Sequence, residues 1–202
     1  NFYKSFNFLM TYAKQKTKLN LVISIGANIP GIFGDPIRTI AAMRPQIEKS
    51  ISEWNISLNR PKTDSKNIDK SLSFRWAPLF ETDPLGGPTD QPKFINTVLV
   101  VGGENFSLIN PNEKAAISLM KKFLDLEKIA GRERDNKEFF WGPRCLDIDF
   151  ISWGGLHMNT ETLVLPHPRL SERNFVLIPL AAVLSTTQGQ LKRINSRNIW
   201  PE

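Results

Sequence analysis

The stretch "WGPRCLDIDF", residues 141–150, ends in alternating apolar and acidic side chains. Successive side chains of a β-strand point to opposite faces of a sheet, so a strand here separates the two kinds of residue. Asp147 and Asp149 lie together on one face, where we expect an open sheet surface. The other face is apolar, and we expect it to pack against helices. Its residues are Leu146, Ile148 and Phe150.

Two carboxylates side by side on a strand repel each other unless a cation lies between them. Mg²⁺ suits such a pair, because it takes one or two carboxylates and fills its other positions with water and substrate phosphates. A bare Asp-x-Asp is more often an ordinary solvated strand face. Here, however, Arg132, Arg134 and Arg144 surround the pair in sequence, and guanidinium groups match phosphate oxygens. The combination indicates a polyphosphate ligand.

Apolar runs bounded by turn residues predict four strands. They cover residues 19–28, 72–82, 94–103 and 146–152. The second and third runs are joined by "DPLGGPTDQPK", residues 83–93, which has the proline and glycine content of a loop.

Two helices are predicted between these strands. The first covers Pro36 to Ser52, with Asp35 as the N-cap. The second is capped by Asn110, has Pro111 at its first position and ends at Gly131. Apolar residues repeat at helical spacing between these limits.

The predicted order is β-α-β-β-α-β, which is the ferredoxin-like arrangement. We therefore expect an α+β fold with an antiparallel sheet, both helices on one face and a C-terminal extension. The expected domain covers residues 21–190, preceded by a disordered extension at 1–20 and followed by a tail at 191–202. The polar stretch 58–71 lacks periodicity and is interpreted as a mobile surface insertion.

Composition narrows the class of protein. The 202 residues carry 26 Lys and Arg against 20 Asp and Glu, a formal charge of +6 that favours an anionic partner. No run approaches the ~20 apolar residues of a membrane helix. The single cysteine, Cys145, excludes an internal disulfide framework, so we expect a cytoplasmic protein.

Other candidate residues have ordinary interpretations on their own. His167 is consistent with a loop histidine. His157 is the only other histidine in the sequence, so no histidine-rich metal site is available. Phe94 and Phe175 are consistent with core residues. Cys145 is interpreted as structural, because no Cys-His pair is indicated. Neither a P-loop nor a G-x-G-x-x-G motif occurs, so an ATP site would be of another kind.

Three segments together resemble a known family. They are "FETDPLGGPTDQPKFINTVLVV" at 80–101, "GRERDNKEFFWGPRCLDIDFISWGG" at 131–155 and "LPHPRLSERNFVLIPL" at 165–180. In order and spacing they resemble the 6-hydroxymethyl-7,8-dihydropterin pyrophosphokinases of the folate pathway, from about Leu21 to about Leu184. The family has a ferredoxin-like α+β fold and acts as a monomer, which agrees with the predicted element order.

The resemblance implies a role for each matching residue. Asp147 and Asp149 resemble the ligands of two Mg²⁺ ions that bridge the phosphates of ATP. Arg132 and Arg144 resemble catalytic arginines, and Trp141 resembles the tryptophan of a closing lid. The triphosphate would be held by Arg134, His167 and Arg173. The pterin would be held at its edge by Thr82, Leu85 and Asn96 and between the rings of Phe94 and Phe175.

The resemblance also implies the reaction and the partners. The pterin hydroxymethyl oxygen attacks the β-phosphorus of ATP, the pyrophosphoryl group moves and AMP leaves. The partners would be ATP and 6-hydroxymethyl-7,8-dihydropterin, with no nucleic acid and no membrane. The chain departs from the family pattern in three places. They are the longer lid "DNKEFF" at 135–140, Asp83 where proline is usual, and Phe94 where tyrosine is frequent.

Two alternatives remain open from the sequence. A basic ferredoxin-like chain could be an RNA-binding domain whose strand aromatics stack on bases, although an acidic pair on the sheet face would repel a phosphate backbone. The chain could also be an inactive relative kept as a binding module. Every matched metal, arginine and aromatic position carries suitable chemistry, which disfavours that second alternative.

Overall fold

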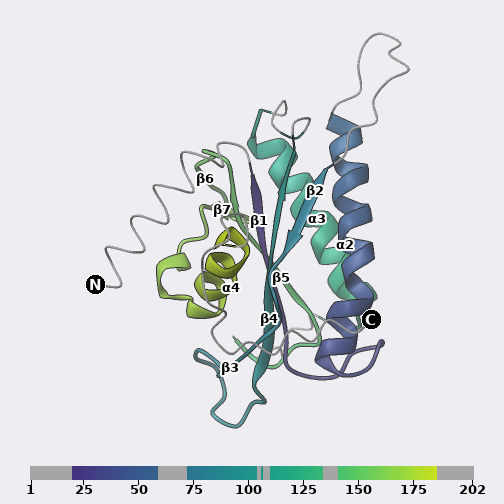
Figure 1. The fold of residues 1–202 in the computed structure, drawn as a ribbon, viewed down its shortest axis with the longest axis vertical. Coiled ribbons are helices and arrows are strands. Elements are labelled where there is room, and N and C mark those ends of the chain that lie inside the picture. The colour runs from purple at the N-terminus through teal and green to yellow at the C-terminus, as the bar shows by residue number, and fades with distance from the viewer. Residues whose placement is uncertain (1–19, 59–71, 104–105, 107–109, 134–140, 186–202) are drawn as a thin grey trace.

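An antiparallel sheet packed against helices forms the fold (Figure 1), so the predicted α+β class is confirmed. The structure is a computed structural model that describes residues 20–58, 72–103, 106, 110–133 and 141–185. Its elements in chain order are β1 (Leu21–Ala27), α2 (Pro36–Leu58), β2 (Ser73–Trp76), β3 (Phe80–Thr82), β4 (Phe94–Gly102), α3 (Glu113–Ile129), β5 (Asp147–Trp153), β6 (Met158–Asn159), β7 (Val164–Leu165), the short 3-10 helix η2 (Leu170–Glu172) and α4 (Asn174–Ser185).

β1 lies in the middle of the sheet, between β4 and β5, and pairs antiparallel with both. The sheet order is β2-β4-β1-β5, and β3 also pairs with β4. In this register Ser24 lies opposite Asp149. Gly26 lies opposite Asp147 on one side and Asn96 on the other. The register therefore brings the two acids beside the end of β1 and the start of β4.

The run 72–82, predicted as one strand, forms two short strands that both pair with β4. Pro78 lies between them and has no N–H to donate to the ladder. The Ala77 N–H still donates to the Val98 carbonyl oxygen at 2.8 Å. The predicted strand is therefore interrupted at Pro78 and resumes along the same partner.

α2 and α3 cover one face of the sheet, on the right of the sheet in Figure 1. Leu146, Ile148 and Phe150 are buried in one cluster with the apolar residues of both helices, so the predicted face of β5 is confirmed. The Phe123 ring of α3 meets the Phe150 ring edge-on, with 6.2 Å between the ring centroids.

α4 covers part of the opposite face, on the left of the sheet in Figure 1. Val176, Leu177 and Val183 of α4 are buried together with Val98 and Val100 of β4. The two predicted helices thus share one face, as expected, but the prediction that the second face is open is wrong where α4 covers it. The reason is that β4 is buried on both faces along most of its length, and an apolar second face needs cover.

The predicted N-cap of α2 is confirmed, because Asp35 Oδ1 accepts a hydrogen bond from the Arg38 N–H at 2.9 Å. The helix continues beyond its predicted end at Ser52. The added turns contain Trp54, which is buried against α3 and donates from Nε1 to the Ala115 carbonyl oxygen at 3.0 Å. Packing of Trp54 against α3 thus stabilises the turns of α2 that follow Ser52.

α3 begins later than predicted. Asn112, not Asn110, caps it, since Asn112 Oδ1 accepts the Ala115 N–H at 3.0 Å. Pro111 therefore precedes the helix and does not occupy its first position. Gly131 follows the C-cap with φ 97°, a backbone region that glycine reaches without strain, so the predicted end of α3 is confirmed.

Several predicted segments lie outside the described residues, wholly or almost so. They are the extension 1–20, the insertion 58–71, the segment 135–140 and the tail 191–202. Of the helices that the structure describes, none combines the length and the apolar character needed to cross a membrane.

We expect Phe123→Ala to lower the free energy of unfolding by about 3–5 kcal/mol, because it leaves a cavity between α3 and β5. Urea unfolding followed by circular dichroism measures this loss. Ile129→Ala, at the end of the same helix and 52% exposed, is the matched control and should change stability by less than about 0.5 kcal/mol. Equal losses in both variants would show that Phe123 is not a core residue.

Candidate active site

A cavity of about 190 Å³ is lined by residues of β1, β4, β5, the β3–β4 loop and the start of α4. Arg132 and His167 do not line the cavity themselves. Arg132 contacts the lining residue Asp147, and His167 accepts a hydrogen bond from the N–H of the lining residue Arg169 at 3.3 Å. Arg134 lies outside the described residues. The predicted site residues that line the cavity are Thr82, Leu85, Phe94, Asn96, Trp141, Arg144, Asp147, Asp149, Arg173 and Phe175.

Asp147 is held between two arginines. Arg132 Nη1 donates to Asp147 Oδ1 at 2.5 Å, and Arg144 Nη1 donates to Asp147 Oδ2 at 2.9 Å. Burial alone would raise the pKa of Asp147, but the charges and hydrogen bonds of Arg144 and Arg132 outweigh it and hold the pKa below its usual value. This carboxylate is therefore ionised at neutral pH.

Asp149 has one arginine partner, because Arg173 Nη1 donates to its Oδ2. Burial and then the neighbouring charge of Asp147 raise the pKa of Asp149 to about 6, although Arg173 opposes the rise. The adjacent acids thus differ in their affinity for protons. The repulsion expected from the sequence is present and is only partly offset by the three arginines.

The donor chemistry of this acid pair fits Mg²⁺. In the part of the chain that the structure describes, no three His, Cys, Asp or Glu side chains gather as a metal cage. Two carboxylates without further protein ligands match an ion that takes its remaining oxygens from water and phosphates. The arginines that now contact Asp147 and Asp149 are in turn suited to those phosphates.

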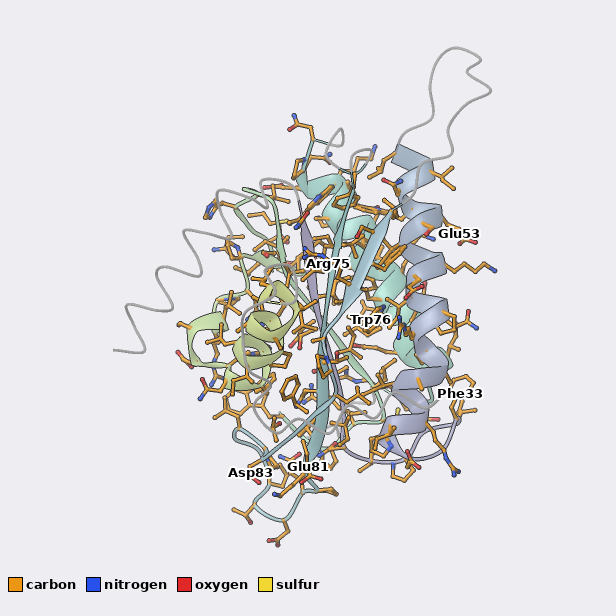
Figure 2. The ribbon with its side chains drawn as sticks, viewed as in Figure 1. Phe33, Glu53, Arg75, Trp76, Glu81 and Asp83 are labelled. Atoms are coloured by element: carbon orange, nitrogen blue, oxygen red, sulfur yellow. The ribbon has the colours of Figure 1, made fainter. Side chains whose placement is uncertain are left out.

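The β3–β4 hairpin forms one wall of the cavity. Asn96 Nδ2 donates to Thr82 Oγ1 at 2.7 Å, which fixes the amide beside β1. A Cβ atom on Gly26 would lie 2.5 Å from Asn96 Oδ1, so a larger residue at this position of β1 would displace the Asn96 amide. Figure 2 shows Glu81 and Asp83 near each other at the end of β3. Lys93 Nζ lies 3.7 Å from Glu81 Oε1 and 3.4 Å from Asp83 Oδ1, so the unusual Asp83 has a cationic neighbour.

Trp141 lies over the β3–β4 loop at the rim of the cavity. Its side chain contacts Gly86, and its carbonyl oxygen lies against Gly87, two glycines with φ 80° and 76°. The Arg169 guanidinium carbon lies 4.7 Å from the centroid of the Trp141 ring. Trp141 itself has φ 60°, a costly conformation for a bulky side chain. The contacts with the loop and with Arg169 accompany that strained backbone.

The sequence analysis missed residues that connect the walls of the cavity. Asn28 accepts the Arg144 N–H on Oδ1 at 2.7 Å and donates from Nδ2 to Gln91 Oε1 at 3.2 Å. Gln91 Nε2 in turn donates to the carbonyl oxygens of Gly86 at 3.0 Å and Trp141 at 3.1 Å. The only sequence signal was the polar residue type, since all of these partners except Gln91 and Gly86 are 50 or more residues apart.

The structure brings the two predicted phenylalanines to the same cavity. Phe94 and Phe175 line the cavity from β4 and α4, and both are only partly buried. Phe175 also packs against the second apolar cluster. The Arg173 guanidinium carbon lies 5.5 Å from the Phe175 ring centroid, so this ring adjoins the charged part of the site.

A sequence profile of the family described as 7,8-dihydro-6-hydroxymethylpterin-pyrophosphokinase matches residues 22–185, which is most of the chain. The chain belongs to this family. The match contains both aspartates, the described arginines of the site and all of the cavity lining. The pyrophosphokinase family resemblance seen in the three sequence segments is thereby confirmed.

Individual relatives in this family agree. A 2-amino-4-hydroxy-6-hydroxymethyldihydropteridine pyrophosphokinase of Bacillus subtilis is 36% identical over 112 residues, 55% of this chain and 59% of the relative. One of the same name from Methylorubrum extorquens is 37% identical over 100 residues, 50% and 56%. The folic acid synthesis protein fol1 of Schizosaccharomyces pombe is 34% identical over 175 residues, 87% and 19%. The chain thus spans a little over half the length of the first two relatives.

We expect the stability of this pyrophosphokinase family member to depend on His167 in acid. The pKa of His167 is lowered from 6.5 to about 4, first by burial and then by the charges of Arg173 and Arg169. Between these values the unfolded chain binds more protons, so the free energy of unfolding rises as the pH rises from about 4 to 6.5. His167→Asn keeps an acceptor for the Arg169 N–H and should lose less stability on acidification.

Urea unfolding at half-unit pH intervals compares the two proteins. As the pH drops through this window, the free energy of unfolding should fall more for the wild type than for the variant. Parallel curves would contradict the lowered pKa of His167, and so would a nuclear magnetic resonance titration of its ring with a midpoint near 6.5.

Proposed function

We propose that the protein transfers a pyrophosphoryl group from ATP to the hydroxymethyl group of 6-hydroxymethyl-7,8-dihydropterin, giving the pterin diphosphate and AMP in folate biosynthesis. One observation carries this proposal. In a chain of this family, Asp147 and Asp149 line a cavity and contact three arginines, and two phenylalanine rings line the same cavity. A polyphosphate and a flat aromatic substrate would fit side by side there.

Asp147 and Asp149 would hold two Mg²⁺ ions together with ATP. Bound there, Mg²⁺ would neutralise the phosphate oxygens and orient the triphosphate. Both carboxylates would have to exchange arginine partners for metal, and the phosphates offer those arginines new acceptors. Arg134, His167 and Arg173 are proposed to hold the triphosphate.

The pterin is proposed to lie between Phe94 and Phe175, because offset stacking suits flat π-systems. Its edge would meet Thr82, Asn96 and the backbone around Leu85. The hydrogen bond between Asn96 and Thr82 orients the amide before any ligand arrives, which favours recognition of a heterocycle with alternating donors and acceptors.

The hydroxymethyl oxygen would attack the β-phosphorus, and the bond from this phosphorus to the oxygen that bridges to the α-phosphorus would break, so that AMP leaves. Charge spreads over the phosphate oxygens in such a transition state, and positioned cationic groups supply much of the catalysis. Arg132 and Arg144 are proposed for that task. Trp141 is proposed to close over the loaded site as part of a lid.

The proposal also covers the topology, the location, the oligomeric state and the partners of the protein. The strand order and pairing support a ferredoxin-like topology. We propose a cytoplasmic monomer that acts on ATP and the pterin, without nucleic acid or membrane partners. The location of the acids within a cavity disfavours binding to an RNA backbone, which would be repelled there.

The direct test is AMP release by the protein supplied with ATP, Mg²⁺ and 6-hydroxymethyl-7,8-dihydropterin. AMP should form in equal amount to the pterin diphosphate, and neither should form without the pterin. ADP as the product would indicate transfer of a single phosphoryl group. Tight RNA binding in EDTA without AMP release would favour the alternative function.

We expect Asp149→Asn to reduce turnover on the order of a hundredfold or more, because loss of one metal ligand removes several kcal/mol of charge stabilisation. The fold should persist, since an asparagine oxygen can still accept from Arg173. Asp125→Asn, on an exposed aspartate of α3, is the matched control. Normal Mg²⁺-dependent turnover by Asp149→Asn would contradict the metal assignment.

A separate prediction concerns the ring of Phe175. Phe175→Ala should weaken pterin binding by about 1–3 kcal/mol, the range for loss of one aromatic stacking partner, and should change ATP binding much less. Calorimetry with the pterin alone and with a Mg²⁺–ATP analogue alone separates the two effects. An equal loss for both ligands would show that Phe175 acts mainly through its packing in the second apolar cluster.

A further inference from the structure

Glu127 is a buried acid beneath the site that the sequence analysis did not single out. It lies in the last turns of α3 with a side chain 1% exposed. A carboxylate at such depth is costly unless it is paired and hydrogen-bonded. Its partners connect α3 to the acid pair on β5.

Glu127 Oε1 contacts both β5 and Arg132. It accepts a hydrogen bond from the backbone N–H of Ile148 at 2.8 Å. Ile148 lies between the two aspartates in β5. The same oxygen lies 3.1 Å from Arg132 Nη1, whose guanidinium also donates to Asp147 at 2.5 Å. Arg132 therefore lies between two carboxylates, and only one of them belongs to the cavity lining.

The end of α3 brings Arg132 back over Glu127. Gly131 takes φ 97°, its N–H donates to the Lys128 carbonyl oxygen at 2.9 Å, and the Arg132 N–H donates to the Glu127 carbonyl oxygen at 3.0 Å. This pair of bonds is the Schellman ending of a helix. The backbone hydrogen bond holds the main chain of Arg132 over Glu127, and the ion pair holds its side chain there.

The two arginines on Asp147 differ in what holds them. The Arg132 side chain is 7% exposed and has a second carboxylate beside it. The Arg144 side chain is 16% exposed, and it also donates from Nε to the Gly142 carbonyl oxygen at 3.2 Å. If Asp147 turns towards another cation, Arg132 keeps a carboxylate partner through Glu127.

We propose that Glu127 is a positioning residue that anchors Arg132 and keeps its charge compensated when Asp147 exchanges that arginine for metal-bound nucleotide. The proposal rests on the proposed function, because it assumes that Asp147 binds metal with ATP. Glu127 itself does not line the cavity. It acts by lowering the cost of releasing Asp147 from Arg132.

The test uses Glu127→Gln, which retains an oxygen for the Ile148 N–H and removes the charge beside Arg132. The probe is Mn²⁺ with α,β-methylene ATP, followed by electron paramagnetic resonance, so no turnover is needed. Arg132 should then hold Asp147 more strongly, and Mn²⁺ affinity should fall on the order of tenfold or more, the effect known for groups that support metal ligands. Turnover should fall in parallel, with little change in KM for the pterin.

Two controls separate positioning from structure. Glu53→Gln, on the exposed outer side of α2 (Figure 2), removes a charge far from the site and should leave Mn²⁺ affinity unchanged. Glu127→Gln in an Arg132→Gln background should have little further effect, because the arginine through which it acts is gone. Equal loss of Mn²⁺ affinity with and without Arg132 would overturn the proposal, and so would wild-type affinity and turnover in Glu127→Gln.

A measurement on the unchanged protein covers the case in which Glu127→Gln fails to fold. The guanidinium protons of Arg132 should stay protected from solvent exchange when Mg²⁺ and α,β-methylene ATP bind, as seen by nuclear magnetic resonance. Loss of that protection would overturn the role of Glu127. If the wild type releases no AMP yet Glu127→Gln still weakens Mn²⁺–nucleotide binding, the proposed reaction fails and the positioning role stands.

Discussion

The carboxylate of Asp147 accepts hydrogen bonds from two arginines at once, and the arrangement of the cavity depends on that double ion pair. Arg132 reaches it from the turn after α3, and Arg144 reaches it from the segment that enters β5. One side chain therefore ties a helix end and a loop to the same strand. Asp147 is mostly buried, so the loss of either arginine would leave an under-compensated charge in a region of low dielectric.

Asp149 lies two residues further along the strand, and its carboxylate has fewer arginine partners to offset the free-energy cost of burying its charge. Its pKa is raised to about 6 by burial and by Asp147, whereas the pKa of Asp147 is lowered by its two arginines. The raised pKa means that the site gives up free energy to keep Asp149 ionised at neutral pH. Such unrelieved repulsion favours any ligand that brings positive charge between the two acids.

Sequence periodicity predicted the features that depend on a single element. Alternation along 146–152 placed Asp147 and Asp149 on one face, and local cap chemistry placed Asp35 at a helix start. Features that join distant segments were not predictable in this way. α4 is apolar around its whole circumference and contains Pro179, so it has no helical stripe to detect. The partner of Glu127 depends on a turn geometry that residue type alone does not specify.

The ion pairs also indicate how a charged ligand could enter without a large change in electrostatic balance. Arg132, Arg144 and Arg173 lie against Asp147, Asp149 and Glu127, so positive and negative groups match in this cluster. ATP with two Mg²⁺ ions is close to neutral as well. In the proposed reaction, carboxylates and guanidinium groups would exchange one opposite charge for another, so no buried charge would be left alone. A site built on such exchange binds polyphosphate and metal together more readily than either one separately, because each component supplies the partners that the other displaces.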